Sequence, residues 1–253
     1  MKTTLAAVGC LLATAASLFA QAPATNTPAN APQLTNSPAA NGNQLTNAPA
    51  AKGERDTNEV DITELMKLPA FTNDTGMIMV KLSDTLWVSA YETTQDDYKK
   101  IAGSNPSRFQ GGRNPVESVS WNEAMDFCAK LTAAENEKKM LPEKFAYALP
   151  TQAQWEALAS GADLKNAVTS SGTPRSSTAP VGSLGATGPG IFDIRGNVCE
   201  WCLDPQDKAY RVARGSSWEN WIEINLRPEF RWYEAPEVRK ETIGFRVMLE
   251  PKG

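Results

Sequence analysis

The 253-residue sequence contains no histidine, and this absence excludes a wide range of chemistry. Sites in which histidine activates a serine or cysteine nucleophile cannot form, and neither can metal sites built on imidazole. Acid–base chemistry would have to use Asp, Glu, Lys, Tyr or Cys. A bound metal would need oxygen or thiolate ligands.

Basic residues and cysteines are also scarce. The 25 Lys and Arg residues are outnumbered by 29 Asp and Glu residues, which gives a formal net charge of -4. Proteins that bind nucleic acids usually present a concentrated basic surface, and the sequence contains no run of Lys and Arg, so no nucleic-acid partner is expected. The four cysteines are Cys10, Cys128, Cys199 and Cys202.

The first 58 residues have the composition of an export signal and a linker. Residues 1–20 combine a lysine, an apolar run and small residues near Ala20, which is typical of a cleaved signal peptide. We therefore expect an exported protein, secreted or periplasmic, without a transmembrane span after signal removal. The alternative is a lipoprotein anchored at Cys10. Residues 21–58, rich in Ala, Pro, Asn and Thr, predict a disordered linker, which leaves residues 59–253 for the folded domain.

Capping signals and periodicity predict an α+β domain with much irregular structure. Ser120 and Glu123 form a capping box before the clearest helix, and Thr151 and Gln154 form a second one. A long Gly-, Ser- and Thr-rich loop follows at 161–190. The expected helices lie at 61–68, after Thr94, at 120–137 and at 151–161, and the expected strands lie at 77–82, 86–91, 211–215 and 243–249.

The stretch GNVCEWC at 196–202 contains two cysteines three positions apart. They could form a redox pair, contribute to a zinc site, or simply pack in the core. The stretch lacks a helix cap and resembles a strand, which would place Cys199 and Cys202 on opposite faces and about 10 Å apart. A disulfide requires Cα atoms within about 7 Å, and a zinc site requires four ligands, whereas only Cys128 is left to join the pair. We therefore interpret the three cysteines as packing residues.

Six stretches in a fixed order resemble the formylglycine-generating, or sulfatase-modifying factor, family. The resemblance covers about 75–250 and implies a C-type lectin-like fold with little regular secondary structure. It also implies a reaction in which copper and oxygen convert a cysteine of a sulfatase to formylglycine. The six stretches are YETTQDDY (91–98), SNPSRFQGGRNPVESVSWNEA (104–124), ALPTQAQWEALASG (148–161), DIRGNVCEW (193–201), RVARGSSW (211–218) and IGFRV (243–247).

The chain departs from this family where the active members carry two cysteines. Those positions correspond to Asn220 and Asn225, and an amide is neither a thiolate ligand nor a redox nucleophile. Copper and formylglycine-generating activity are therefore not expected, and the family branch with a histidine-bound iron is excluded as well. What the resemblance leaves is a candidate groove for an anionic ligand, lined by Ser217, Trp218, Asn220, Asn225, Arg227 and Arg231, with Trp221 and Trp232 as further walls. Alternatively, the two arginines form ordinary ion pairs with nearby glutamates.

The resemblance also implies a structural calcium ion in the loop around GNVCEW. Its ligands would be the carboxylates of Asp193 and Glu200 and the backbone carbonyls of Gly196 and Val198. Such a mixture of charged and neutral oxygens suits calcium, and Gly196 permits the turn. Alternatively, the two carboxylates are solvated or bind loop amides. Cys199 stands where this family usually has tryptophan.

We therefore expect an exported, calcium-stabilised binding or structural module without catalytic activity. Its partner would be a protein or another component of the cell envelope. One alternative is an oxidoreductase of the formylglycine-generating type that modifies a protein. Another is a subunit of a cell-envelope assembly that uses the domain only as an assembly surface.

Overall fold

The computed structural model describes residues 69–171, 174–186 and 190–253. The predicted signal peptide, the predicted linker and the helix expected at 61–68 lie outside these residues. Within them, no helix combines the length and the apolar character needed to cross a membrane. The described residues combine helices with two sheets, as expected for a mixed α and β domain.

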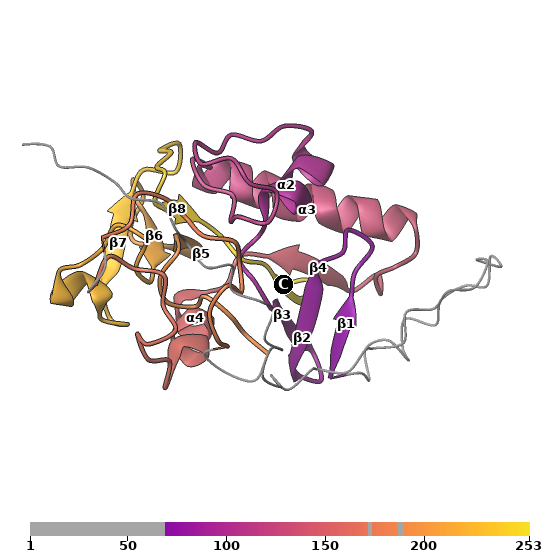
Figure 1. Cartoon of the computed structure of the whole chain (residues 1–253). Coiled ribbons are helices and arrows are strands. Elements are labelled where there is room, and N and C mark those ends of the chain that lie inside the picture. Colours follow the sequence, from indigo (N-terminus) through magenta and orange to yellow (C-terminus); the bar gives the residue numbers. More distant parts are fainter. Residues whose placement is uncertain (1–68, 172–173, 187–189) are drawn as a thin grey trace, which may run out of the picture. The chain divides into compact units, whose positions relative to one another are not determined.

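The first sheet has five antiparallel strands in the order β1-β2-β3-β9-β4. The predicted strands at 77–82 and 86–91 are confirmed as the hairpin of β2 and β3. The last strand of the chain inserts between β3 and β4, so both ends of the described domain contribute to this sheet (Figure 1). The strands are β1 (Ala70–Thr72), β2 (Ile78–Ser83), β3 (Leu86–Ser89), β4 (Phe145–Ala148) and β9 (Met248–Pro251).

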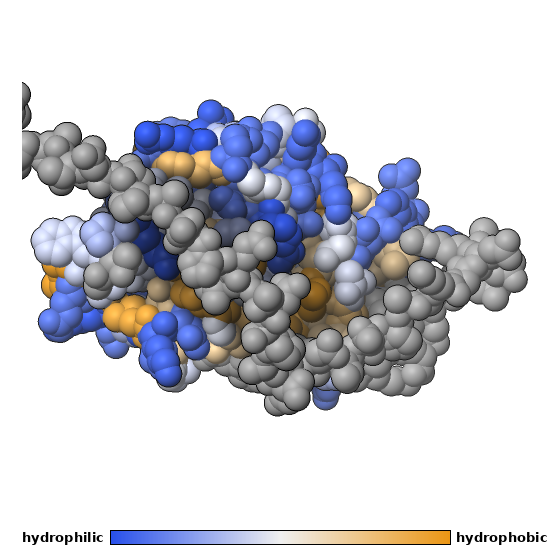
Figure 2. All heavy atoms as spheres, viewed as in Figure 1, coloured by the Kyte–Doolittle hydropathy of each residue, from blue (hydrophilic) through white to orange (hydrophobic). Residues whose placement is uncertain are grey.

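Helices α2 (Gln95–Ala102) and α3 (Trp121–Glu137) lie together beside β4 in Figure 1. Thr94 caps α2 through a 3.1 Å hydrogen bond from the Asp97 backbone N–H, and the capping box of α3 is formed as predicted. The buried face of α3 includes Phe127 and Leu131, whereas hydrophilic residues cover the outer side of both helices (Figure 2). The apolar periodicity thus orients α3 toward the core.

The second sheet has four strands in the order β7-β6-β5-β8, with antiparallel pairs except for the parallel pair β5–β8. Helix α4 (Gln152–Ala159) begins at its predicted capping box, and a short 3-10 helix, η1, spans Glu223–Leu226. The described residues of the 161–190 loop contain no helix or strand. The strands are β5 (Cys199–Pro205), β6 (Arg211–Arg214), β7 (Arg231–Glu234) and β8 (Ile243–Gly244).

The prediction of one continuous strand at 243–249 is wrong. This stretch contributes β8 to the second sheet and the start of β9 to the first, and the chain crosses between the sheets at 245–247. Phe245, Arg246 and Val247 are each 0% exposed, so successive side chains are buried on both sides of the backbone. A segment buried on both sides appears as a continuous strand in the sequence even where it changes sheet.

The buried apolar residues form two clusters, and GNVCEWC lies between them. Cys199 packs in the larger cluster with α3, whereas Cys202 packs in the smaller one with Trp155 of α4. The two side chains therefore point to opposite faces of β5, as predicted. Cys128, Cys199 and Cys202 are all buried and unpaired, which confirms that they are packing residues. Burial raises the pKa of Cys128 to about 12 and raises those of the other two thiols as well.

Candidate functional site

The structure distributes the six predicted groove residues over different surroundings. Ser217 and Asn220 lie together, because the Asn220 Oδ1 accepts hydrogen bonds from the Ser217 backbone N–H at 2.8 Å and its hydroxyl at 3.1 Å. Both residues line a cavity of about 70 Å³ that Cys199 and Trp232 also line. Trp218 is buried beside it and donates its indole N–H to the Glu241 carbonyl at 3.1 Å. Ser217, Asn220 and Trp232 thus line one small cavity, and their role in binding a ligand stays a prediction.

The predicted arginine pair does not form. Arg227 is exposed and bridges to Glu223 at 3.0 Å, whereas Arg231 bridges to Glu156 of α4 at 2.8 Å and lines a different cavity. Asn225 lies in η1 and lines neither cavity, and Trp221 is 69% exposed. The alternative of ordinary ion pairs with glutamates thus describes both arginines. Arg227 follows η1 and Arg231 begins β7, and the two side chains do not face a common groove.

The loop of the predicted calcium site is buried and strongly bent. Asp193 has a φ of 54°, in the left-handed region, and its Oδ2 accepts a 2.6 Å hydrogen bond from the Gly182 backbone N–H. Gly196 has a φ of 93°, and a Cβ there would lie 2.6 Å from the Val168 backbone nitrogen. Both the torsion and the close backbone contact require glycine at this position, in agreement with the predicted turn.

Glu200 is held by protein groups on both of its carboxylate oxygens. Its Oε1 accepts from the Arg246 Nη2 at 2.7 Å, and its Oε2 accepts from the Arg246 Nε at 2.8 Å and the Trp155 indole N–H at 3.0 Å. Both ionic partners are almost completely buried. Glu200 therefore has a structural ion-pair role, and its role as a calcium ligand stays a prediction.

Glu92 is a buried carboxylate that sequence reasoning missed. It accepts hydrogen bonds from the Asn197 side-chain amide at 2.7 Å and the Val198 backbone N–H at 3.0 Å. Burial, together with the nearby Asp193 and Glu200 carboxylates, raises the pKa of Glu92 well above its usual value. The pKa values of Asp193 and Glu200 are also raised, because the effect of burial exceeds the opposing effect of the Arg246 charge. Three buried carboxyl groups thus surround one buried arginine.

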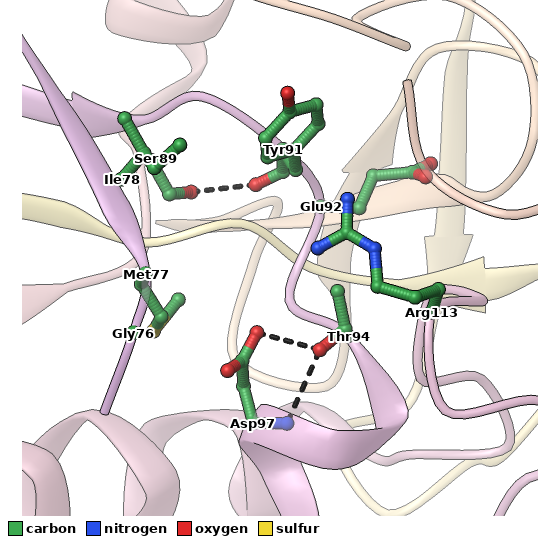
Figure 3. A pocket seen from close by; sticks show the side chains of 9 residues that line it. All are labelled: Gly76, Met77, Ile78, Ser89, Tyr91, Glu92, Thr94, Asp97 and Arg113. Atoms are coloured by element: carbon green, nitrogen blue, oxygen red, sulfur yellow. Dashed lines mark hydrogen bonds between the residues drawn. The ribbon is translucent and has the colours of Figure 1, made fainter. Parts of the chain in front are cut away.

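A small cavity of about 40 Å³ lies beside Glu92 at the end of β3 (Figure 3). The Arg113 guanidinium lies over the Tyr91 ring at 5.2 Å from its centroid, and the Thr94–Asp97 cap closes the other end of the cavity. Such a volume accommodates water but not an organic substrate. The Glu92 carboxylate lines this cavity and also binds Asn197 and Val198 in the loop before β5.

The residues at the expected cysteine positions and the described thiols are engaged or buried in the structure. Asn220 is engaged in a turn with Ser217, and the three described thiols are buried with pKa values raised by burial. Within the described part of the chain, no group of three or more Asp, Glu or Cys side chains is arranged to hold a metal ion. The expected calcium ligands include only two carboxylates, those of Asp193 and Glu200, and the calcium site stays a prediction.

Several known proteins are similar to this chain in sequence or in fold. A chaperone protein, LppX of Paenibacillus barcinonensis, is 29% identical over 199 residues, which are 55% of this chain and 71% of the relative. A formylglycine-generating enzyme of Thermomonospora curvata is 28% identical over 201 residues, 61% of each chain. The solved structure of Treponema denticola variable protein 1 matches with a TM-score of 0.58 and 26% identity, covering 66% of this chain and 84% of that one. The model of the sulfatase-modifying factor enzyme 1-like domain matches residues 38–251, and this chain therefore belongs to that family.

Proposed function

We propose that this chain is an exported, non-catalytic member of its family, with a C-type lectin-like fold, that binds a protein or another cell-envelope component. One observation supports this most directly: asparagines occupy both positions of the expected catalytic cysteines, and Asn220 is used as the acceptor of a local turn. An amide cannot supply the thiolate on which the copper chemistry of active members depends. The three thiols in the described part of the chain are buried, and burial raises the pKa of each.

A copper(I) titration separates this proposal from an oxidoreductase. We expect no tight one-to-one copper(I) binding that depends on Cys128, Cys199 or Cys202. Tight stoichiometric binding that Cys199→Ser abolishes would support the oxidoreductase instead.

The similarity to a protein named as a chaperone supports a protein partner. The predicted signal peptide and linker support a location outside the cytoplasm. Crosslinking in the native cell envelope, followed by purification of this chain, would distinguish a free binder from an assembly subunit. A constant, stoichiometric set of co-purifying envelope proteins favours the assembly subunit, whereas recovery of the chain from the soluble exported fraction favours the free binder.

We further propose that calcium stabilises the loop of Asp193, Gly196, Val198 and Glu200. The excess of buried carboxyl groups over Arg246 supports a cation there, because it would offset their mutual repulsion. A cation that binds only the native state must raise the melting temperature. We expect a chelator to lower the melting temperature of the wild type but not of Asp193→Ala. The matched control is Asp84→Ala, at an exposed turn in the β2–β3 hairpin, which should keep the chelator effect. If chelator leaves the melting temperature of the wild type unchanged, the calcium site is refuted.

A further inference from the structure

A row of charged residues crosses one face of the second sheet. Glu200 on β5 is opposite Arg214 on β6, and Arg214 is opposite Arg231 on β7. Residues opposite one another on adjacent strands share a face, so the three side chains lie side by side. Helix α4 lies over this row: Trp155 contacts Glu200, and Glu156 contacts both arginines.

The two arginines of this row share a single glutamate as their ion-pair partner. Glu156 offers one oxygen, Oε1, to both guanidinium groups, at 2.7 Å from the Arg214 Nη1 and 2.8 Å from the Arg231 Nη2. Gln152 similarly offers a single amide oxygen, at 3.4 Å from Arg214 and 2.9 Å from Arg231. A guanidinium can bind both oxygens of a carboxylate, yet neither arginine has a carboxylate to itself.

Arg214 is the more unusual of the two, because its side chain is 0% exposed. It lies over the Trp155 ring at 5.0 Å and donates to the Pro228 carbonyl at 2.7 Å. Its Nε is buried and has no hydrogen-bond partner within the described part of the chain. A buried cation that is incompletely paired strongly favours an added anion, since water does not screen the interaction.

A cavity of about 500 Å³ opens in front of this pair. That volume falls within the range of small-molecule sites, whereas the cavity beside Asn220 measures only about 70 Å³. Small, uncharged residues and Glu229 line the rest of its wall. Because two glutamates accompany the two arginines, the lining suits a ligand whose single oxyanionic group replaces Glu156 at the arginines and whose remaining body is small and neutral. The neutral part of the wall is formed by Ala159, Ser160, Gly161, Ala162 and Pro228.

We propose that this cavity binds a small organic anion through a carboxylate or phosphate group held by Arg214 and Arg231. Glu156 occupies the arginines in the free protein and competes with the ligand for them. The site is distinct from the Ser217–Asn220 cavity, and it does not depend on whether the chain is catalytic or on which protein it binds. It also explains why Arg231, a predicted anion-binding residue, points toward α4 and not toward Arg227.

The competition gives the proposal an unusual test, because two substitutions should act in opposite directions. Benzoate and phenyl phosphate are titrated calorimetrically into the full chain at constant low ionic strength. We expect saturable one-to-one binding at millimolar concentrations of at least one probe. Arg231→Gln should weaken that binding about tenfold by removing one charged contact. Glu156→Gln should tighten it about tenfold by removing the internal competitor. Preference for one probe identifies the headgroup as a carboxylate or a phosphate.

A matched pair elsewhere on the surface provides the control. Arg239 binds Glu123 at 2.6 to 2.8 Å, and neither residue lines the cavity. Arg239→Gln therefore changes the net charge as Arg231→Gln does, and Glu123→Gln changes it as Glu156→Gln does. Both controls should leave the affinity within about twofold of the wild type. Equal effects of Arg231→Gln and Arg239→Gln would show unspecific attraction, and the absence of saturable binding of both probes would overturn the site. Arg231 is partly exposed, so Arg231→Gln should not change the melting curve. An unchanged curve excludes unfolding as the cause of weaker binding.

Discussion

The buried carboxyl group of Glu135 leads to a quantitative prediction about stability and pH. Glu135 lies in the last turn of α3 and is 2% exposed. Its carboxylate accepts hydrogen bonds from the Tyr147 hydroxyl at 2.9 Å and the Asp74 backbone N–H at 3.2 Å. Burial outweighs these two bonds and raises the pKa of Glu135 from 4.5 to about 7.

This pKa difference determines the sign of the effect. Because the pKa is higher in the native state, the native protein binds more protons than the unfolded chain between pH 4.5 and about 7. The contribution of Glu135 to stability is therefore complete below pH 4.5 and is lost as the pH rises to about 7. At about 1.4 kcal/mol per pH unit, the loss is on the order of 3 kcal/mol.

Urea unfolding followed by tryptophan fluorescence measures this loss. Glu135→Gln retains a side-chain oxygen and cannot ionise, so its stability should lack this part of the pH dependence. We expect the difference in free energy of unfolding, variant minus wild type, to rise by roughly 3 kcal/mol between about pH 4.5 and about pH 8. Glu137→Gln, at an exposed position two residues further on, should give a constant difference. A constant or falling difference for Glu135→Gln would refute the reasoning.

Three further predictions concern the core and its helices. Arg246→Met leaves the buried Glu200 carboxylate without its cation and should lower the free energy of unfolding by roughly 3–5 kcal/mol in urea; a cost below about 1 kcal/mol would contradict the buried ion pair. The thiols of Cys128, Cys199 and Cys202 should resist Ellman's reagent until urea unfolds the chain, and labelling of any of them in native protein would show that the core is open. Ser120→Ala removes the cap of α3 and should cost about 1 kcal/mol by the same urea assay, whereas an unchanged midpoint would show that packing alone holds the helix end.

Local signals predicted the helices well. The cap at Thr94 and the boxes at Ser120 and Thr151 satisfy backbone N–H groups of the first helical turn, and this chemistry depends only on nearby residues. The cysteines were also predictable, because alternation along a strand determines which face each side chain occupies. Where neighbours along the chain decide the structure, the sequence is sufficient.

Most of the errors arose where distant segments decide the structure. Strands β1, β4 and β7 were not expected, because each has only three or four residues, and β4 in addition acquires its role from pairing with the distant strand β9. The split of 243–249 depends on both sheets being in place. Glu92 belongs to a recognised stretch, yet its contact with Val198, 106 positions away, leaves no signal in the local sequence. The same holds for the pairing of Arg214 with Arg231 through Glu156.

The buried polar groups connect the two sheets. Glu92 follows β3 of the first sheet and binds the loop before β5 of the second, and Arg246 lies where the chain crosses from β8 to β9. The Arg246 guanidinium also donates to the Ser89 carbonyl at 3.1 Å, so it holds β3 and β5 at once. A chain with purely apolar groups here would pack, but it would lack directional bonds that fix one sheet against the other.

Glu200 lies between the proposed calcium site and the arginine cavity. It contacts Arg246 on one side and, through the Trp155 indole, the α4 helix that carries Glu156 on the other. A cation near Asp193 would compete with Arg246 for Glu200, whereas an anion at Arg214 would displace Glu156 and free that end of α4. Any coupling between the two ligands must be reciprocal in their binding free energies.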